Sequence, residues 1–494
     1  MTLRGWRRLW SAAVVGIACA ATVAADAGGD RDRLVAALLG PTPLADDVEA
    51  LSDRIGGRAT GSEANRRAVA WSAARLAEAG VTVRRESFPV SAGWLERSAR
   101  AEIRGEGVTF APRLAAMPFS TPTGPDGVSG PLVDGGRGAE GDFTRLGARA
   151  RGAFVLIEQD ELADVEGLFR EYNESAAIER RARAAGVAGV AYMSSRASGL
   201  LYRHNVAIGA TNARPMVVIE RDAARRAQRL IRHGASLALT LWLDVDLATS
   251  GTADNVVAEI PGAVHPEDIV LMGAHLDSWD LGAGTLDNGV NAMLLVDIAR
   301  QIVRLGVKPA RTIRLMLWNG EELGMLGSYG YVQAHAAELD HHIVAGAIDI
   351  GCGKVTGFYT NGRPDLVPVV DRLLAPLAGL GPFAQVDVPV VGTDNFDFML
   401  EGVPNLIANQ ESARYGLSYH AANDQVGQCD MGTVRLNAAI VGGLVWGFAE
   451  DDSRLPRHSH ADVQALMNRT DLADQMKTFN LWDGWANGTR GRRP

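Results

Sequence analysis

The sequence lacks an excess of basic charge. Its 49 Lys and Arg residues are outnumbered by 58 Asp and Glu residues, so the formal net charge is -9. Aromatic residues make up 6% of the chain, and no basic patch with interleaved aromatics occurs. Nucleic-acid binding surfaces need clustered positive charge. The composition therefore disfavours a nucleic-acid partner, and its 47% hydrophobic and 22% charged residues are typical of a globular protein.

Internal repeats are missing, and long apolar runs are missing after the N-terminal segment. That segment is different: basic residues (Arg4, Arg7 and Arg8) precede a short apolar run and a group of small residues ending at Ala25. This pattern predicts a signal peptide over residues 1–25, cleaved near Ala25, and hence a secreted or periplasmic protein with no membrane span in the mature chain.

Two other interpretations of the N-terminus remain open. A membrane anchor is one, although the apolar run is short for a span. A lipoprotein linked through Cys19 is the other, although Gly16 stands where a lipobox usually has Leu.

Cysteine is scarce, with three residues in the whole chain. Removal of the leader would leave Cys352 and Cys429. In an exported protein such a pair can close one disulfide. Two separate buried thiols fit the sequence equally well.

The 494 residues are too many for one ordinary core, so we expect two folded units. Strand patterns alternate with helix patterns in residues 30–119 and 248–455, which predicts a discontinuous α/β domain with a mainly parallel, mixed sheet flanked by helices. Residues 120–247 begin with turns and continue as short β-like runs, which predicts a β-rich inserted domain with a structural or covering role. The polar tail, residues 456–494, is expected to be loosely held.

The densest group of ionisable residues follows an apolar run at 269–272, which predicts a buried strand. His275, Asp277 and Asp287 come within about a dozen residues of one another, just before an apolar helix pattern. Open α/β sheets place their chemistry in such loops at the carboxyl ends of strands. A His and carboxylates in one loop indicate a candidate metal site.

Further ionisable side chains follow later predicted strands or lie in a late loop: Glu321, Glu322, Asp349 and His420. Adjacent residues on a strand point to opposite faces, so Glu321 and Glu322 serve one site only if the chain has turned, which Gly320 permits. Mixed His and carboxylate ligands suit zinc. A bridging carboxylate would hold two ions roughly 3.5–4 Å apart.

Taken together, the motifs HLDSWDLGAGTLDNG, NGEELGMLGS and YHAAND, with Asp349, resemble the co-catalytic di-zinc exopeptidase family that includes the bacterial leucyl aminopeptidases. The HLDSWD motif is similar to the motif of the carboxypeptidase Q (plasma glutamate carboxypeptidase) branch of this family. The resemblance spans most of the mature chain and includes the GGRATGS stretch. It implies the zinc exopeptidase fold, with residues 120–247 as a protease-associated domain.

The resemblance also implies two Zn²⁺ ions per chain and their ligands. His275 and Asp349 would hold one zinc, Glu322 and His420 would hold the other, and Asp287 would bridge them.

Two catalytic roles are carried over in the same way. Glu321 would be the general base, and Asp277 would orient His275. The sequence has Asn288 where the family usually has a second Asp, which puts only local hydrogen bonding in doubt. The Asp287–Asn288 peptide is expected to be cis, as is frequent in this family.

These residues predict a secreted or periplasmic metallo-exopeptidase that hydrolyses short peptides or dipeptides. One alternative is a glutaminyl cyclase-like enzyme with one zinc, and another is a receptor-like binding protein, although such proteins have lost ligands that are all present here. A hydrolase of non-peptide amides is a third. The sequence does not separate aminopeptidase from carboxypeptidase or dipeptidase activity, since neither Asp394 nor Arg414 can be placed in the pocket. A homodimer is a further expectation from the resemblance.

Overall fold

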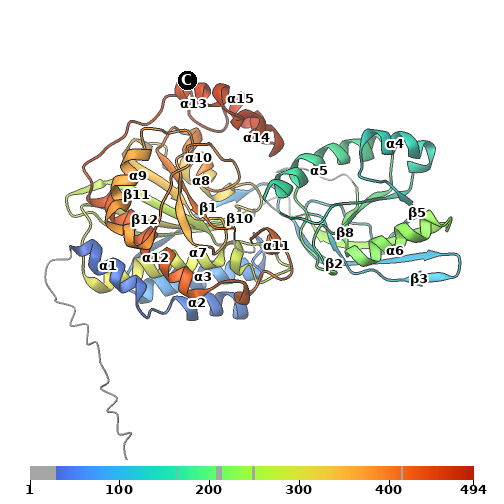
Figure 1. The fold of residues 1–494 in the computed structure, drawn as a ribbon, viewed down its shortest axis with the longest axis horizontal. Coiled ribbons are helices and arrows are strands. Elements are labelled where there is room, and N and C mark those ends of the chain that lie inside the picture. Colours follow the sequence, from blue (N-terminus) through green and yellow to red (C-terminus); the bar gives the residue numbers. More distant parts are fainter. Residues whose placement is uncertain (1–28, 164, 207–213, 248–250, 413–414) are drawn as a thin grey trace, which may run out of the picture.

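The computed structural model describes residues 29–163, 165–206, 214–247, 251–412 and 415–494. The predicted signal peptide and Cys19 lie outside the described residues. The described residues form two β-sheets, a first sheet of seven strands and a second sheet of eight. The two sheets occupy two lobes that lie side by side (Figure 1).

The first sheet has a parallel centre and antiparallel edges. Its strands lie in the order β1 (Thr82–Val90), β10 (Gly251–Ile260), β12 (Arg311–Trp318), β11 (His265–His275), β13 (His342–Ala347), β15 (Asn405–Gln410) and β14 (Val355–Tyr359). The pairs from β12 to β15 are parallel, whereas the three outer pairs are antiparallel. The sheet is therefore mixed as predicted, but half of its pairs are antiparallel, which corrects the expectation of a mainly parallel sheet. Only four residues link β10 to β11, and so short a link reverses the chain instead of crossing over.

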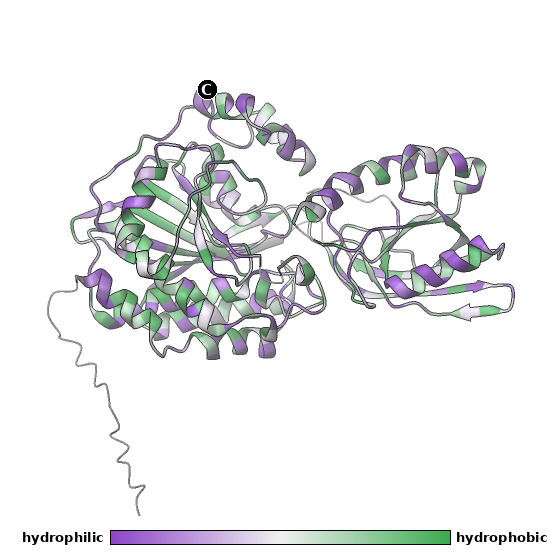
Figure 2. Cartoon of the chain, viewed as in Figure 1, coloured by the Kyte–Doolittle hydropathy of each residue, from purple (hydrophilic) through white to green (hydrophobic). Residues whose placement is uncertain are grey.

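Helices cover both faces of the first sheet because its central strands alternate apolar side chains between the faces. Val270 and Met272 of β11 belong to the core shared with one group of helices, whereas Ile269 and Leu271 pack on the opposite face. The first group is α1 (Asp30–Leu39), α2 (Leu44–Ala50), α3 (Glu63–Glu78), α7 (Val290–Leu305), α9 (Val367–Leu374) and α12 (Met431–Glu450). The opposite face is covered by α8 (Leu326–Ala334) and α10 (Phe396–Leu400). The central strands of this sheet are mostly hydrophobic (Figure 2).

Long apolar runs were expected to be missing after the N-terminal segment, but helix α12 is long and apolar enough to cross a membrane, the one such helix among the described residues. However, 72% of its apolar window is buried inside the molecule. It packs against α1 and α7, as the core helix of a globular fold does.

The second sheet begins earlier in the chain than predicted. Its strands lie in the order β3 (Val108–Phe110), β2 (Leu95–Gly105), β9 (Leu237–Asp246), β5 (Val128–Asp134), β6 (Phe154–Ile157), β7 (Gly189–Met193), β8 (Met216–Ile219) and β4 (Leu114–Ala116). Its helices are α4 (Glu140–Leu146), α5 (Val165–Ala185) and α6 (Arg221–Arg232). The expected boundary at residue 120 was wrong, because β2, β3 and β4 belong to this sheet: β2 pairs with β9 along its whole length.

The C-terminal tail is folded, contrary to the expectation that residues 456–494 are loosely held. It forms α13 (His460–Arg469), α14 (Leu472–Thr478) and α15 (Trp482–Ala486), which lie over the lobe of the first sheet (Figure 1). Met467, Met476 and Trp485 share a buried cluster with Phe396 and Leu400 of α10. Apolar side chains at helical spacing thus hold the tail despite its polar end.

The two remaining cysteines form a disulfide, Cys352–Cys429, with 5.7 Å between their Cα atoms. Cys352 follows β13, and Cys429 precedes α12. The disulfide therefore joins two loops at one end of the first sheet.

Candidate metal centre and pocket

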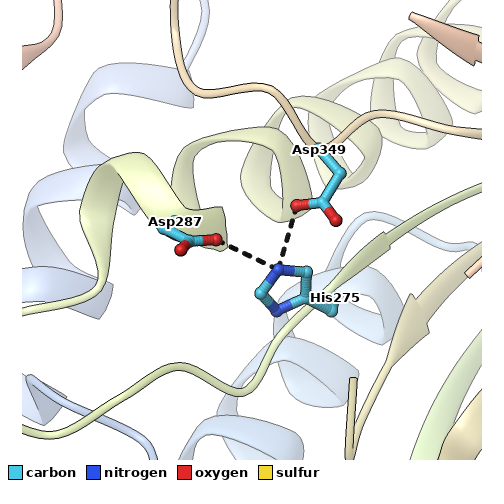
Figure 3. A group of neighbouring side chains, drawn as sticks. All are labelled: His275, Asp287 and Asp349. Atoms are coloured by element: carbon cyan, nitrogen blue, oxygen red, sulfur yellow. Dashed lines mark hydrogen bonds and ion pairs between the residues drawn. The ribbon is translucent and has the colours of Figure 1, made fainter. Parts of the chain in front are cut away.

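One triad of side chains gathers where β11 and β13 end. His275 is the last residue of β11, Asp349 follows β13, and Asp287 lies in the irregular turn η3 (Thr285–Gly289) that leads into α7. The Nε2 atom of His275 is 3.0 Å from Asp349 Oδ1 and 3.2 Å from Asp287 Oδ1. Figure 3 shows both carboxylates pointing at this nitrogen.

A second triad shares Asp287. His420 Nε2 is 3.0 Å from Glu322 Oε2 and 3.5 Å from Asp287 Oδ2. The two oxygens of Asp287 therefore face different imidazoles, Oδ1 toward His275 and Oδ2 toward His420. In each triad the potential ligand atoms lie within 4.8 Å of one another. All five predicted ligands thus come together around one shared carboxylate.

The donor atoms of the two triads fit divalent cations. Asp287 Oδ2 and Glu322 Oε1 are buried and have no hydrogen-bond partner in the described part of the chain. Burying carboxylates without compensation is costly, and a bound cation removes that cost. Two His–carboxylate sets with few protein ligands each are typical of zinc sites that leave positions open for water or substrate.

The pKa shifts of Glu322, His275 and His420 reflect the burial of several carboxylates close together. Burial raises the pKa of Glu322 well above its usual range, and the neighbouring Asp287 carboxylate raises it further. Burial opposes a charge on His275, but Asp349, together with Asp277 and Asp287, raises the pKa of this imidazole well above its usual range. Burial lowers the pKa of His420 to about 4. The raised pKa of Glu322 favours its protonated form, and a metal ion would compete with that proton.

Glu321 belongs to neither triad but lies in the same place. Gly320 has φ +74°, so the chain turns there as predicted, and Glu321 and Glu322 both line one pocket. Burial raises the pKa of Glu321 well above its usual range, and Asp349 and Glu322 contribute.

Asp277 touches His275 through its main chain more closely than through its carboxylate. His275 Nδ1 is 2.9 Å from the Asp277 carbonyl oxygen and 3.7 Å from Asp277 Oδ1. The carboxylate accepts hydrogen bonds from the hydroxyl of Thr60 (2.6 Å) and from the backbone N–H groups of Glu321 and Glu322 (3.4 Å each). Asp277 thus links the His275 strand end to the Glu321–Glu322 turn.

The GGRATGS stretch holds the loop that carries Asp287, a role that the sequence reasoning missed. Arg58 is fully buried, and its guanidinium donates to the carbonyl oxygens of Leu276 (2.7 Å), Ala283 (2.6 Å) and Gly284 (2.7 Å). The sequence carries no local signal of this role, because only the fold shows that Arg58 is buried. Ser62, the last residue of the stretch, caps α3 by accepting from Asn65 N–H.

Asp424 and Asn288 hold the backbone around Asp287. The carboxylate of Asp424 accepts from the N–H groups of Leu286 (2.6 Å) and Asp287 (3.1 Å). Burial raises the pKa of Asp424 to about 7. Asn288 Nδ2 donates to the carbonyl oxygen of Ile348 (2.7 Å), and the Asp287–Asn288 peptide is cis as expected.

The pocket beside the triads is bordered by parts of the chain that the sequence did not assign to it. Tyr172, His204 and Asn205 come from the second sheet and its helices, and Phe479 comes from α14. Tyr419 and Gly392 also line the pocket. Of the two residues that the sequence could not place, Asp394 is buried outside this lining and Arg414 lies outside the described residues. Tyr172, Asn205 and Phe479 stand in none of the motifs.

A buried arginine anchors the second sheet against the metal-site loops. Arg203 donates from Nε and Nη2 to the carboxylate of Asp280 (2.8 and 2.9 Å) and from Nη1 to the Ala116 carbonyl oxygen (2.9 Å). It also pairs with Glu96 of β2. Asp280, in the loop after His275, is therefore a structural partner of the second sheet.

The mixed sheet carries two triads at the carboxyl ends of its parallel strands, and their shared carboxylate makes them one candidate centre for two metal ions. Residues 255–445 match the sequence profile described as Peptidase family M28, and the chain contains a domain of that family. The resemblance found in the motifs is therefore confirmed.

Similar proteins cover more of the chain. Carboxypeptidase Q of Homo sapiens is 29% identical over 243 residues, which are 49% of this chain and 51% of that protein, so the chain spans about half the length of this relative. The structure of a peptidase M28 precursor from Shewanella amazonensis SB2B has a TM-score of 0.76 at 25% identity, covering 86% of this chain and 97% of that one. A zinc aminopeptidase from Bacillus subtilis shares the fold, with a TM-score of 0.67 at 22% identity, covering 84% of this chain and 96% of that one.

Proposed function

We propose that this protein is a metal-dependent exopeptidase that hydrolyses terminal peptide bonds of short peptides with two zinc ions. The observation that carries the proposal is the position of Asp287, whose two oxygens face His275 and His420 separately. In this assignment His275 and Asp349 hold one ion, Glu322 and His420 hold the other, and Asp287 bridges them. Bound zinc would supply Lewis-acid chemistry, polarising a carbonyl group and lowering the pKa of a water molecule.

Glu321 is assigned as the general base. It lines the pocket beside the triads without being part of either, so its carboxylate is available to take a proton from water and pass it to the leaving amine. Its buried environment, which raises its pKa, suits a group that must both accept and release a proton. Asp277 holds the imidazole of His275 through its carbonyl oxygen and the Glu321–Glu322 turn through its carboxylate.

The enclosure of the pocket supports action at the end of a peptide. Residues of the second lobe and of α14 border it on the side opposite the first sheet. Both the name of the carboxypeptidase Q relative and that of the zinc aminopeptidase describe exopeptidases.

The second sheet is proposed to be a protease-associated domain. A secreted or periplasmic location is proposed as well, supported by the N-terminal charge pattern and by the disulfide, which is stable in oxidising compartments.

The test combines metal analysis with hydrolysis. The purified protein is expected to contain two zinc ions per chain by elemental analysis, to cleave short peptides in a library with N- and C-blocked controls, and to lose this activity with a chelator. One zinc per chain would instead favour the glutaminyl cyclase-like alternative. Hydrolysis that persists in chelator would contradict the metal mechanism.

The variant Glu321→Gln tests the base. It should keep its zinc but lose about 10²–10⁴-fold in kcat, because the amide cannot accept the proton. The matched control is Glu338→Gln, which changes a half-exposed carboxylate outside the pocket, in the turn that follows α8. A Glu321→Gln enzyme as active as this control would show that another group is the base.

A further inference from the structure

The wall that the second sheet contributes to the pocket contains two buried polar atoms without partners. His204 is 1% exposed and Asn205 is 2% exposed, and both residues line the pocket. His204 Nε2 and Asn205 Oδ1 have no hydrogen-bond partner within the described ranges. Leaving such atoms unpaired costs free energy, so a ligand that pairs with them is favoured.

The contacts of His204 fix Nε2 as an acceptor. The single hydroxyl hydrogen of Tyr202 goes to Gln159 Oε1 (3.0 Å), which as a carbonyl oxygen only accepts. The Tyr202 oxygen, 2.8 Å from His204 Nδ1, must therefore accept from Nδ1–H. Burial lowers the pKa of His204 to about 4, so the ring is neutral. In a neutral ring with its proton on Nδ1, Nε2 carries a lone pair.

The contacts of Asn205 fix its free atom as an acceptor too. Its Nδ2 donates to Glu171 Oε2 (3.0 Å), and a carboxylate oxygen cannot serve the amide oxygen instead. Glu171 is held by the buried Arg196 on its other oxygen (3.2 Å). The Oδ1 atom that remains is an acceptor in a pocket wall.

This acceptor pair lies next to the proposed metal centre. The backbone N–H of Arg203 donates to the carbonyl oxygen of His420 at 2.9 Å. His204 therefore directly follows a residue that is hydrogen-bonded to a proposed zinc ligand. The same pocket is lined by Glu321 and Glu322. Within the described part of the chain, its lining includes no Lys or Arg, the residues that would bind a substrate carboxylate.

We infer that His204 Nε2 and Asn205 Oδ1 are a specificity-determining acceptor pair that binds the free α-ammonium group of the substrate. Two lone pairs in an acidic pocket pair with an N–H donor that carries positive charge, whereas a carboxylate would be repelled. The inference rests on the proposed function and sharpens it: the protein selects substrates with a free N-terminus, and the selection comes from the second sheet.

Kinetics on a matched substrate pair test the selection. Leucine p-nitroanilide and its N-acetyl derivative differ only in the ammonium group. The wild type should prefer the free amine, and both His204→Phe and Asn205→Ser should raise KM for it by about 10- to 100-fold with a smaller change in kcat. His204→Phe keeps a ring against Tyr192 and Tyr202, and Asn205→Ser provides a second variant if packing fails.

The control is Val206→Ala, which changes the same wall without removing an acceptor. It should alter the rates for both substrates in parallel and keep their ratio. The quantity compared is the ratio of kcat/KM for leucine p-nitroanilide to kcat/KM for its N-acetyl derivative. The inference would be overturned if this ratio stayed unchanged in His204→Phe and Asn205→Ser. It would also be overturned if the ratio fell equally in Val206→Ala.

Binding separates failure of the inference from failure of the proposed function. Calorimetry with the zinc-loaded protein compares leucinamide with N-acetyl-leucinamide. Tighter binding of leucinamide that is lost in both variants supports the acceptor pair, even if no peptide is hydrolysed. Equal binding of the two ligands, or a preference for an N-blocked ligand with a free carboxylate, would overturn it even if hydrolysis is normal.

Discussion

The two sheets contribute to one pocket in different ways. The first sheet supplies ionisable side chains at the ends of its parallel strands, with the shared carboxylate of Asp287 at their centre. The second sheet supplies the opposite wall and is fastened to the first by single buried side chains, above all Arg203. Chemistry is thus concentrated in short loops of one sheet, whereas enclosure and recognition depend on isolated residues of the other.

The first prediction concerns Asp287, the carboxylate that the two triads of the first sheet share. Asp287→Ala should lose both zinc ions and at least about 10³-fold in kcat/KM, because neither triad keeps three ligands. Zinc per chain is measured by elemental analysis after dialysis. The exposed carboxylate of the second sheet, changed in Asp246→Ala, is the control and should keep both ions. Unaltered zinc content in Asp287→Ala would remove the bridging role.

The second prediction breaks the fastening between the sheets. Arg203 is 1% exposed and bridges Asp280 and Glu96, so Arg203→Met leaves two partly buried carboxylates unpaired. The free energy of unfolding should fall by about 3–5 kcal/mol. Zinc content should be unchanged, since no ligand is lost. Denaturant unfolding and elemental analysis measure the two quantities.

Arg97→Met is the matched control for this variant. Arg97 pairs with Asp246 on the surface of the same sheet, with 62% of its side chain exposed, and such pairs contribute about 0–1 kcal/mol. If Arg203→Met were no more destabilising than Arg97→Met, the second sheet would be held by packing alone.

The same contrast explains what the sequence could predict. His275, Asp287 and Glu322 stand in dense motifs directly after apolar strand patterns, so a local pattern and a family resemblance were enough to find them. The strands around the site, such as β11 and β12, were equally clear because each contains a run of four apolar residues that is buried on both faces.

The parts of the fold and of the pocket that the sequence did not predict depend on contacts between segments far apart in the chain. Strand β2 has few buried residues of its own and pairs with β9 more than a hundred residues later, so nothing local assigns it to the second sheet. Arg203, His204 and Asn205 are ordinary polar residues in sequence, and only the fold shows that they are buried. The tail differs: Val463, Leu466 and Met467 lie at helical spacing within α13, a signal that the polar end of the tail obscured.

The third prediction concerns the covalent link within the first-sheet site. The Cys352–Cys429 disulfide spans 77 residues and joins the loops that follow Asp349 and His420, whereas the second sheet has no such link among the described residues. The double variant Cys352→Ser/Cys429→Ser should lose about 2–4 kcal/mol of unfolding free energy, because the unfolded chain gains freedom. It should also release zinc to a chelator faster. Reduced wild-type protein should behave like the variant, and a stability equal to that of the oxidised protein would contradict this role.

The smallest expected effect comes from a single hydroxyl contact between the two sides of the pocket. The hydroxyls of Tyr172, in α5, and Tyr419, next to His420, are 3.0 Å apart, while the ring of Tyr172 also packs on Phe479 at 4.8 Å between centroids. Tyr172→Phe keeps the ring and removes one hydrogen bond, which should cost about 0.5–1.5 kcal/mol. Because the contact closes the pocket and does not touch a proposed ligand, KM should rise roughly 2- to 10-fold while kcat and zinc content stay the same. Tyr329→Phe, which removes a hydroxyl bonded to the tail outside the pocket, should leave KM unchanged. A fall in kcat in Tyr172→Phe would instead show that the second lobe contributes to the chemical step. The second sheet would then not be limited to enclosing the pocket and recognising the substrate.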